Sequence, residues 1–378
     1  MRSLLNIAAA IVAAASCTIP AARAQTPTKP PLLIGTIVSV TGPIAGVGIP
    51  ERDGALLAQK FINAKGGVNG RPIQLLIEDD ASNPDTAVSR ANALIRSSQV
   101  KALIGSTGIA STVAVGGLTD PFKLPQVAFS GIGPAVEFKR SCIVHLLPPQ
   151  ELNARAALVY AKDVIGAKRI GVLHDSGYGQ AVFNSMKQVA PEYGIELAQV
   201  EKFEIGATDV TAQAAKVKAA DPQAVIIVAS SAAPFRNVRD IRIAAPVIGS
   251  IASSSYEYIK AMGEAAEGVI FPEFLIAEDP LPHQRTFVEQ FKAEYGRLPK
   301  NFEAAGWDSV HLVAKLFSEA EDNGNSQAQC AALRTKFKGT LADYDFAAPD
   351  LTGMQLTGFS FSQVKNGAFI RLPFRIAN

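Results

Sequence analysis

The sequence predicts a doubly wound α/β protein. Short apolar runs of strand length recur along the chain, and the segments between them carry apolar residues at helical spacing. The alternation breaks at Pro148-Pro149, and a second series of strands and helices begins at Lys168. Continuously apolar strands separated by amphipathic helices are typical of parallel sheets covered on both faces. Two such domains are expected, which fits a length of 378 residues.

The predicted strands are the apolar runs at residues 32–38, 73–77, 102–104, 126–129, 169–173, 224–228 and 247–248. Between the first two, Ala55, Ala58 and Ile62 are spaced by three and four residues, which predicts a helix. Beyond Pro272 the chain is predicted to be helical at 282–295 and 301–320. It ends with two extended segments, 354–361 and 368–374, around Asn366-Gly367, a dipeptide typical of hairpin turns.

One strand and helix repeat, residues 62–88, is marked at each of its boundaries. A helix is expected to end at Ala64, and two glycine-containing turns follow it. An apolar strand then runs into Asp79-Asp80, and Asn83-Pro84-Asp85 opens the next helix. Because adjacent strand residues point to opposite faces, the two aspartates do not form a catalytic pair. We expect them to cap the turn into that helix.

Residues 1–24 are predicted to be a cleavable signal peptide. Arg2 supplies a positive charge, residues 4–15 are apolar but too short to span a bilayer, and residues 22–24 form a small-x-small cleavage site. The mature chain would begin at Gln25. The alternative is a lipoprotein signal in which Cys17 is acylated, although Ala14 stands where such sites favour Leu or Val.

Composition excludes several classes of protein. No later segment is an uninterrupted apolar span of about 18 residues, so the mature chain is not expected to insert into a membrane. A net charge of +2 with scattered basic residues gives no indication of nucleic-acid binding. After processing, two cysteines remain, which is too few for a zinc framework. In an oxidising compartment they can form one disulfide, with two buried free thiols as the alternative; they are Cys142 and Cys330.

Several segments, taken in order, resemble the leucine/isoleucine/valine-binding protein family, the solute receptors of bacterial ABC importers. Beside residues 62–88 they are Ser39-x-Thr41-Gly42-Pro43, VLHDSGYGQ at 172–180, AAEGVIFP at 265–272, FKAEYGRLP at 291–299 and AAGWDSV at 304–310. The resemblance implies a type I periplasmic binding protein, in which two Rossmann-like lobes are joined by three hinge crossovers and close on a solute between them. We expect the crossovers near Pro148, Pro272 and Ala348. Residues 25–148 and 273–348 would then form the first lobe, and 149–272 and 349–378 the second.

Loops that follow the strands are the predicted binding site. Ligands of open α/β sheets lie beyond the carboxyl ends of strands, where helix N-termini present unpaired N–H groups. The loop after Gly105 is the main candidate, because its hydroxyl and N–H groups suit a carboxylate or carbonyl oxygen. Alternatively, Ser111 or Thr112 is only a helix N-cap, and Tyr178 only covers a helix end. The predicted ligand-binding residues are Thr41, Ser106, Thr107, Ile109, Ala110, Ser111, Thr112, Ser130, Ile132, Tyr178, Ser230, Ser231 and Ser253.

Motifs of the common enzyme classes are missing from the sequence. It contains no G-x-S-x-G and no G-x-x-x-x-G-K-[ST]. Gly131-Ile132-Gly133 lacks the third glycine of a dinucleotide site. The four histidines stand apart without metal-ligand spacing, and among them His174, at a strand end, is the one placed for acid–base chemistry. No catalytic residue, metal or cofactor is predicted.

The predicted function is that of a periplasmic receptor which binds a small organic solute and delivers it to an inner-membrane ABC permease. A ligand sensor of the same fold, feeding a receptor or regulator, is the first alternative, and an exported α/β enzyme is the second. A neighbouring permease gene would favour import and a neighbouring kinase gene sensing. Unchanged ligand recovered from the denatured protein would argue against an enzyme.

The solute is predicted not to be an ordinary aliphatic α-amino acid. In the amino-acid binders of the family, a serine run receives the carboxylate, and here Ile109 and Ala110 occupy its first two positions. Pro134 stands at a threonine position of that family. The second-lobe segment 249–255 offers no carboxylate to pair with an ammonium group.

An apolar solute, neutral or bearing a carboxylate, is expected instead, such as an aromatic acid or a short amide. The side chains expected to surround it are Ile109, Ile132, Phe274 and Tyr178. Three acidic residues could still supply the missing charge, namely Asp175, Glu257 and Glu273.

Overall fold

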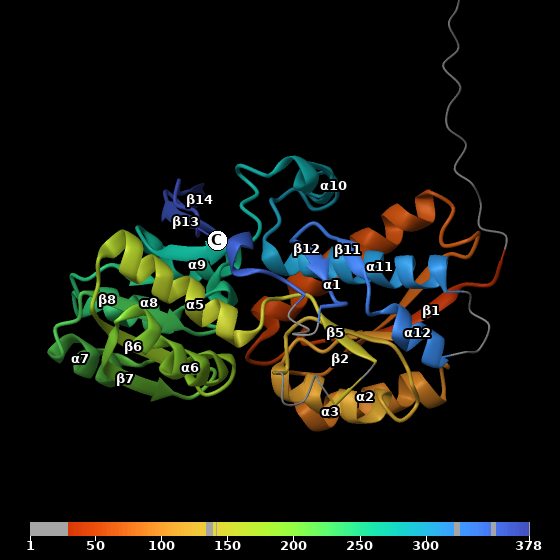
Figure 1. Cartoon of the computed structure of the whole chain (residues 1–378), viewed down its shortest axis with the longest axis horizontal. Helices are drawn as coiled ribbons and strands as arrows, with labels where there is room; N and C mark the ends of the chain where they lie inside the picture. The colour runs from red at the N-terminus through yellow and green to blue at the C-terminus, as the bar shows by residue number, and fades with distance from the viewer. Residues whose placement is uncertain (1–28, 134–138, 141, 321–325, 349–352, 378) are drawn as a thin grey trace, which may run out of the picture.

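The computed structural model describes residues 29–133, 139–140, 142–320, 326–348 and 353–377. The predicted signal peptide, Cys17 and Pro134 lie outside the described residues. Within the described ranges, no helix combines the length and the apolar character needed to cross a bilayer. Two sheets, each flanked by helices, lie in two halves along the long axis of the molecule (Figure 1). The predicted doubly wound α/β class is confirmed.

A parallel sheet forms the five-stranded half, on the right in Figure 1. Its strand order is β2-β1-β3-β4-β5, so the order reverses between β1 and β3. Such a reversal separates the loops that follow the two strands and leaves a crevice for a ligand. The strands are β1 (Leu32–Val38), β2 (Ile73–Asp79), β3 (Ala102–Gly105), β4 (Gln126–Ala128) and β5 (Ile143–His145).

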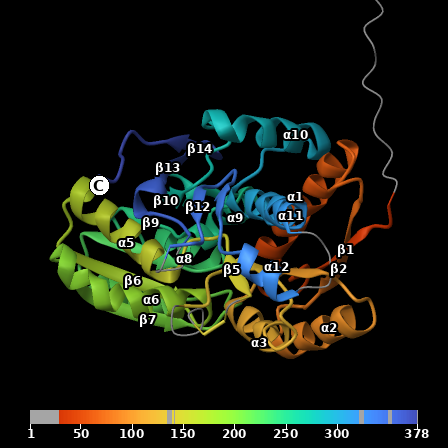
Figure 2. The same cartoon turned by 45° about the vertical axis from the view of Figure 1, so that its right-hand side comes forward.

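Helices of the five-stranded half come from both ends of the chain. Helix α11 packs along α1, and both Figure 1 and Figure 2 show them side by side. Gly54 and Gly306 allow this approach, because a Cβ atom at either position would lie within 2.0 Å of a main-chain oxygen of the other helix. The helices are α1 (Ala45–Ala64), α2 (Pro84–Arg96), α3 (Ile109–Thr119), α10 (Arg285–Tyr295), α11 (Asn301–Glu319) and α12 (Ser326–Ala332).

The seven-stranded half has the strand order β14-β13-β10-β9-β8-β6-β7. Strands β6 to β10 are parallel to one another, whereas β13 is antiparallel to both β10 and β14. The strands are β6 (Arg169–Asp175), β7 (Glu196–Phe203), β8 (Ala224–Val228), β9 (Val247–Ile248), β10 (Ile270–Glu273), β13 (Ser360–Lys365) and β14 (Ala368–Arg371). The helices are α5 (Gln150–Tyr160), α6 (Tyr178–Val189), α7 (Thr211–Ala219), α8 (Ala233–Asp240) and α9 (Tyr256–Met262).

The C-terminal segment contributes to both halves. A two-stranded sheet of β11 (Lys336–Lys338) and β12 (Asp343–Asp345) follows α12, and the chain then enters the seven-stranded sheet as the hairpin β13–β14. A disulfide joins Cys142, just before β5, to Cys330 on α12, with their Cα atoms 4.5 Å apart. It therefore connects α12 to the edge of the five-stranded sheet.

The predicted strands omit β5, β7 and β10. Strand β7 was not predicted, because as an edge strand with partly exposed faces it carries the polar sequence ELAQVEKF. The predicted opening of α2 at Asn83-Pro84-Asp85 is confirmed, because Asn83 is the N-cap and its side chain accepts from the N–H groups of Asp85 and Thr86. Asp79 and Asp80 cap the turn before this helix, as predicted, by accepting from the N–H groups of Ala81 and Ser82. They also accept from the hydroxyls of Thr41 and Ser39.

Candidate functional site

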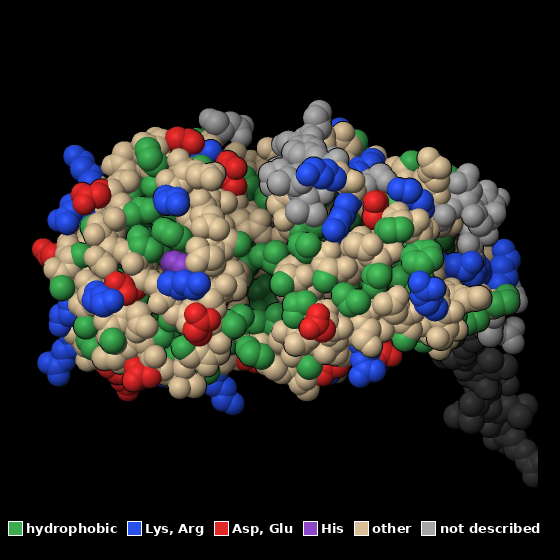
Figure 3. Space-filling model, turned by 90° about the horizontal axis from the view of Figure 1, so that it is seen from below, with side chains coloured by type: hydrophobic (Ala, Val, Ile, Leu, Met, Phe, Trp, Pro, Cys, Tyr) green, Lys and Arg blue, Asp and Glu red, His purple; other side chains and the backbone are tan. Residues whose placement is uncertain are grey.

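A cavity of about 360 Å³ lies between the two halves. Figure 3 shows the surface hollowed at this place, with hydrophobic side chains around the opening. Loops that follow β1, β2, β3 and β4 supply the wall from the five-stranded half, and loops that follow β6, β7, β8 and β9 supply the opposite wall. The lining residues are Ile44, Val47, Ser82, Pro84, Thr107, Gly108, Ile109, Ala110, Ser111, Ser130, Leu147, Pro148, Gln150, Asn153, Ser176, Gly177, Tyr178, Ala181, Ile205, Ser230, Ile251, Ala252 and Phe302.

The N-terminus of α3 faces the cavity. The helix begins at Ile109 with Gly108 as its N-cap, and no side chain caps it. Thr112 is the first residue of α3 whose N–H makes a helical hydrogen bond, and it donates to the Gly108 carbonyl at 2.9 Å. The N–H groups of the three residues before it have no partner within the helix, and all three line the cavity. This end of the pocket therefore offers donors to an oxygen of a ligand.

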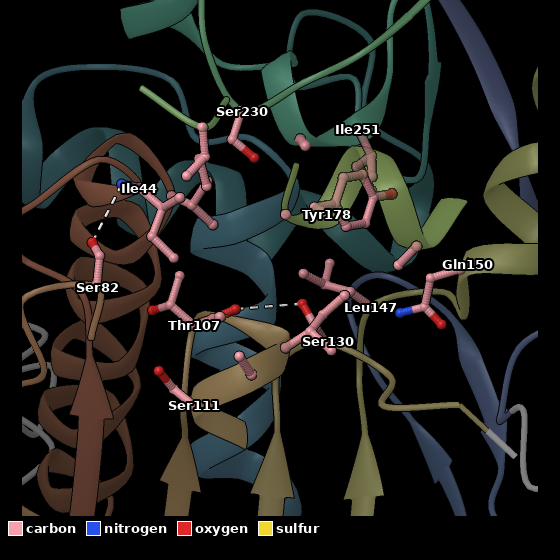
Figure 4. Close-up of a pocket in the computed structure, with 18 of the residues that line it drawn as sticks. Ile44, Ser82, Thr107, Ser111, Ser130, Leu147, Gln150, Tyr178, Ser230 and Ile251 are labelled. Carbon is pink, nitrogen blue, oxygen red and sulfur yellow. Dashed lines mark hydrogen bonds between the residues drawn. The ribbon is translucent and has the colours of Figure 1, made fainter. Parts of the chain in front are cut away.

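Neither Ser111 nor Thr112 is the N-cap of α3. The alternative interpretation, in which one of them is only a helix N-cap, is therefore wrong. Ser111 is 3% exposed and lines the cavity from inside the first turn (Figure 4). Thr112 points away from the cavity, and its hydroxyl donates to the Ser106 carbonyl at 2.9 Å. Because Gly108 has no side chain, the cap position stays open toward a ligand.

A buried hydrogen-bond network supports the loop behind this wall. The Thr107 hydroxyl donates to Glu51 of α1 at 2.6 Å and accepts from the Ser39 N–H at 3.1 Å. Ser39 and Ser106 both donate to the carboxylate of Asp80. Desolvation raises the pKa of Glu51 well above its ordinary value, against the opposing effect of the Thr107 hydrogen bond. The network therefore fixes the loops that follow β1, β2 and β3 relative to one another.

On the opposite wall, Asp175 at the end of β6 fixes two loops that line the cavity. Its carboxylate accepts from the N–H groups of Gly177 at 2.9 Å, Gly179 at 2.7 Å and Ser230 at 2.9 Å. Burial raises the pKa of Asp175, while these three hydrogen bonds oppose the rise. The N-terminus of α6 is thus satisfied by the protein itself, unlike that of α3. Tyr178, the first residue of α6, presents its ring to the cavity (Figure 4).

Seven of the predicted ligand-binding residues come together in this cavity. They are Thr107, Ile109, Ala110, Ser111, Ser130, Tyr178 and Ser230. In Figure 4, Thr107, Ser111 and Ser130 form one wall, with Ser130 donating to the Thr107 carbonyl at 3.5 Å. Tyr178 and Ser230 lie on the other.

Six predicted residues lie outside the cavity: Thr41, Ser106, Thr112, Ile132, Ser231 and Ser253. The hydroxyls of Thr41 and Ser253 are turned to local partners, Asp79 at 2.6 Å and the Ser250 carbonyl at 3.3 Å. Phe274 packs against Phe359 and lies outside it as well. A hydroxyl that follows a strand can bond to neighbouring protein groups instead of a ligand, and the sequence does not distinguish the two roles.

Apolar residues of the cavity were largely missed by sequence reasoning. Ile44, Val47 and Phe302 lie on helices or their caps, Ile205 comes from the loop after β7, and Ile251 begins a short 3-10 helix after β9. An apolar side chain that lines a pocket cannot be told from a core residue in the sequence. Phe302 also comes from α11, which is distant in sequence from the other lining segments. His174 stacks on Phe183 with ring centroids 4.6 Å apart and does not line the cavity. The site therefore gives it no acid–base role.

No aspartate, glutamate, lysine, arginine or histidine lines the cavity among the residues that the structure describes. In the same described part of the chain, no group of three or more His, Cys, Asp or Glu residues is arranged to hold a metal ion. The arrangement offers apolar contact, hydroxyl groups and helix N–H donors. It is suited to binding a small molecule.

Comparisons with known proteins place the chain among solute receptors. Residues 31–368 match the family described as periplasmic binding protein. The chain is 26% identical over 325 residues to a leucine-, isoleucine-, valine-, threonine- and alanine-binding protein of Pseudomonas aeruginosa, with 81% of this chain and 86% of that protein covered. It is 27% identical over 312 residues to a Leu/Ile/Val-binding protein homolog of Brucella melitensis, covering 80% and 83%. Its fold is similar to that of the leucine-binding protein LivK from Thermotoga maritima, with a TM-score of 0.81, 23% identity, and 90% and 97% covered.

Proposed function

The chain belongs to the periplasmic binding protein family, as its sequence motifs indicate, and we propose that it is the solute-binding component of an ABC importer. Relatives named for binding leucine, isoleucine and valine support this class of transport. Its proposed location is the periplasm, reached through the predicted signal peptide. The proposed partners are a small organic solute and an inner-membrane ABC permease, and no catalytic step is part of the proposal.

The binding mechanism that we propose is closure of two lobes on the solute. Lobe I would comprise residues 25–148 and 273–348, and lobe II residues 149–272 and 349–378. Strands of the five-stranded sheet fall within 32–145, and those of the seven-stranded sheet within 169–273 and 360–371, which supports this division. Because both lobes line the cavity, a solute would contact both most completely when they are closed, and this differential contact would drive closure.

The observation that carries the proposed solute class is the uncharged lining of the cavity among the described residues. The ammonium group of an α-amino acid would lose its hydration on entering and would find no counter-charge. Such an unpaired charge costs several kcal/mol, enough to remove micromolar affinity. We therefore propose that the solute carries no ammonium group.

The three acidic residues that could have supplied a counter-charge are used elsewhere. Asp175 accepts from three main-chain N–H groups. Glu273 is fully buried and pairs with Lys300 at 2.7 Å. The Glu257 carboxylate lies 3.9 Å from the Arg297 guanidinium, outside the cavity.

The proposed solute is small and apolar with an oxygen at one end, such as an aromatic acid or a short amide. The oxygen would accept from the N–H groups at the start of α3 and from the Ser111 hydroxyl. The apolar body would lie against Tyr178, Ile205 and Ile251. A volume of about 360 Å³ is at the lower end of ordinary ligand pockets, which favours a compact molecule.

Isothermal titration calorimetry tests the solute class. Leucine, isoleucine, valine and phenylalanine would be titrated beside benzoate and short aliphatic amides. We expect the amino acids to bind more weakly than micromolar, and at least one acid or amide to bind more tightly than they do. Micromolar or tighter binding of any of the four amino acids would refute the proposed class.

A further inference from the structure

Tyr258, on α9, does not line the cavity but holds one of its walls. Its hydroxyl donates to the main-chain carbonyl of Ser230 at 2.8 Å. The N–H of Ser230 donates to Asp175 at 2.9 Å, so this cavity residue is held at both its carbonyl and its N–H. Tyr258 is therefore part of the framework that places the wall from the seven-stranded half.

The ring of Tyr258 also reaches the five-stranded half. It lies against Gly46, the second residue of α1. Ile44 and Val47, on either side of Gly46 in the sequence, both line the cavity. A Cβ atom at position 46 would lie 2.7 Å from the Tyr258 hydroxyl oxygen and 2.8 Å from the Cζ carbon. Real Cβ atoms do not approach other heavy atoms this closely. Gly46 lies in the first turn of α1, its φ is not positive, and the nearest atoms to a Cβ there all belong to Tyr258, so Tyr258 is what limits a side chain at this position.

A second contact between the halves lies at the lip of the cavity. Pro43 precedes α1, and Gly206 follows β7; both are exposed. The Cβ of Pro43 would lie 3.7 Å from a Cβ atom built on Gly206. Cβ atoms of a disulfide are about 3.5–4.5 Å apart, so a cysteine pair at these positions can report on whether the halves meet. Gly206 has a φ of +84°, at which a side chain is strained, but this strain is the same in every protein compared, and only the ratios of their rates are used.

We propose that Tyr258 is a positioning residue of the binding site, which fixes Ser230 and sets how closely the two halves approach, and that Gly46 is what permits the full approach. The proposal deepens the proposed closure mechanism and rests on it. A side chain at position 46 would meet Tyr258 before the halves come together, so the cavity would stay open although none of its lining residues is changed.

Disulfide trapping in the full mature chain tests this without any solute. The reference protein carries Pro43→Cys and Gly206→Cys, and the rate of cross-linking is measured with oxidised glutathione while Cys142 and Cys330 remain paired. Adding Gly46→Leu should slow cross-linking by about tenfold or more, because the arrangement that brings the cysteines together becomes rarer. Adding Tyr258→Ala to that variant should restore the rate to within about threefold of the reference, since the obstructing ring is gone.

Gly117→Leu is the matched control. Gly117 lies in α3, is exposed, and a Cβ atom there would meet nothing within 4 Å. This variant should cross-link at the reference rate. Leucine favours helices over glycine, so Gly46→Leu should not lower the thermal midpoint of the protein, which separates obstruction from misfolding.

Two results would overturn the proposal. They are equal rates in the reference and the Gly46→Leu variant, and a slow Gly46→Leu variant that Tyr258→Ala does not rescue. Because no solute is added, the outcome is independent of the solute class. If calorimetry refuted the proposed solute class while cross-linking gave the expected pattern, only the solute class would be wrong. The proposed role of Tyr258 would still stand.

Discussion

At the scale of single residues, charge is kept out of the cavity and concentrated in a buried cluster beside it. Glu273, at the end of β10, accepts from Lys300, Asn301 and the hydroxyls of Ser254 and Ser362. Both the Lys300 and the Glu273 side chains are fully buried. The cluster joins the N-terminus of α11 to the seven-stranded sheet at a predicted crossover. Buried charges are tolerated there because each has several partners.

Replacement of Lys300 should strongly destabilise the protein. Lys300→Met removes the positive partner and leaves the Glu273 carboxylate buried without a counter-charge. Loss of one partner of a buried ion pair typically costs about 3–5 kcal/mol of unfolding free energy. Urea unfolding followed by circular dichroism measures this loss.

An exposed lysine provides the matched control for that measurement. Lys60 pairs with Glu294 at 2.6 Å, but the two side chains are 67% and 37% exposed. Lys60→Met should cost less than about 1 kcal/mol, because water screens such pairs. Equal losses in the two lysine variants would contradict a special role for the buried pair.

At the scale of elements, the disulfide links a helix near the C-terminus of the chain to a strand in its N-terminal half. Cys330 lies on α12 and Cys142 immediately before β5, separated by 188 residues. Helix α12 has only seven residues, too few to be stable by itself. Its place at the edge of the sheet therefore depends on this bond and on its packing against α11.

Removal of the disulfide should lower stability without changing the fold. The double variant Cys142→Ser with Cys330→Ser is expected to lose about 2–5 kcal/mol of unfolding free energy, since the unfolded chain is no longer constrained by a long loop. Urea unfolding under non-reducing conditions gives the value. Titration of the unfolded, unreduced native protein should find no reactive thiol, and two thiols per mature chain would contradict the bond.

At the scale of the whole molecule, two halves with similar architecture share one cavity and differ in what they offer to it. The five-stranded half supplies an open helix N-terminus at Gly108. The seven-stranded half satisfies its own helix N-terminus through Asp175 and supplies the aromatic ring of Tyr178. A solute with one oxygen-bearing end and one apolar end would fit this asymmetry in a single orientation.

Closure on binding should be visible in the dimensions of the molecule. Small-angle X-ray scattering should give a smaller radius of gyration after saturation with a compound that calorimetry shows to bind, because the closed form is stabilised by contacts from both walls. Glycine, a small amino acid without an apolar body, is a suitable negative control at the same concentration. An unchanged radius of gyration with a saturating ligand would argue against closure of the two lobes on the solute.

The sequence alone determined the fold class, the family and most of the strands that are buried on two faces, although the buried strands β5 and β10 were not predicted. Strands at residues 32–38 and 224–228 were predicted to the residue, because a strand covered by helices on both sides has an unbroken apolar sequence. The turns around Gly66 and Asn366 were likewise fixed locally, by residues that tolerate positive φ. Edge strand β7 escaped prediction since exposure removes the apolar signal.

Only the tertiary structure decided which residues meet in the cavity. Thr41 and Ser106 follow strands just as Thr107 and Ser130 do, yet their hydroxyls are turned to Asp79 and Asp80. Apolar contributors such as Ile44, Ile205 and Phe302 come from distant segments and carry no mark in the sequence. The physical reason is that a strand end and its loop are specified by short-range preferences, whereas a binding wall depends on how two separately folded sheets face each other.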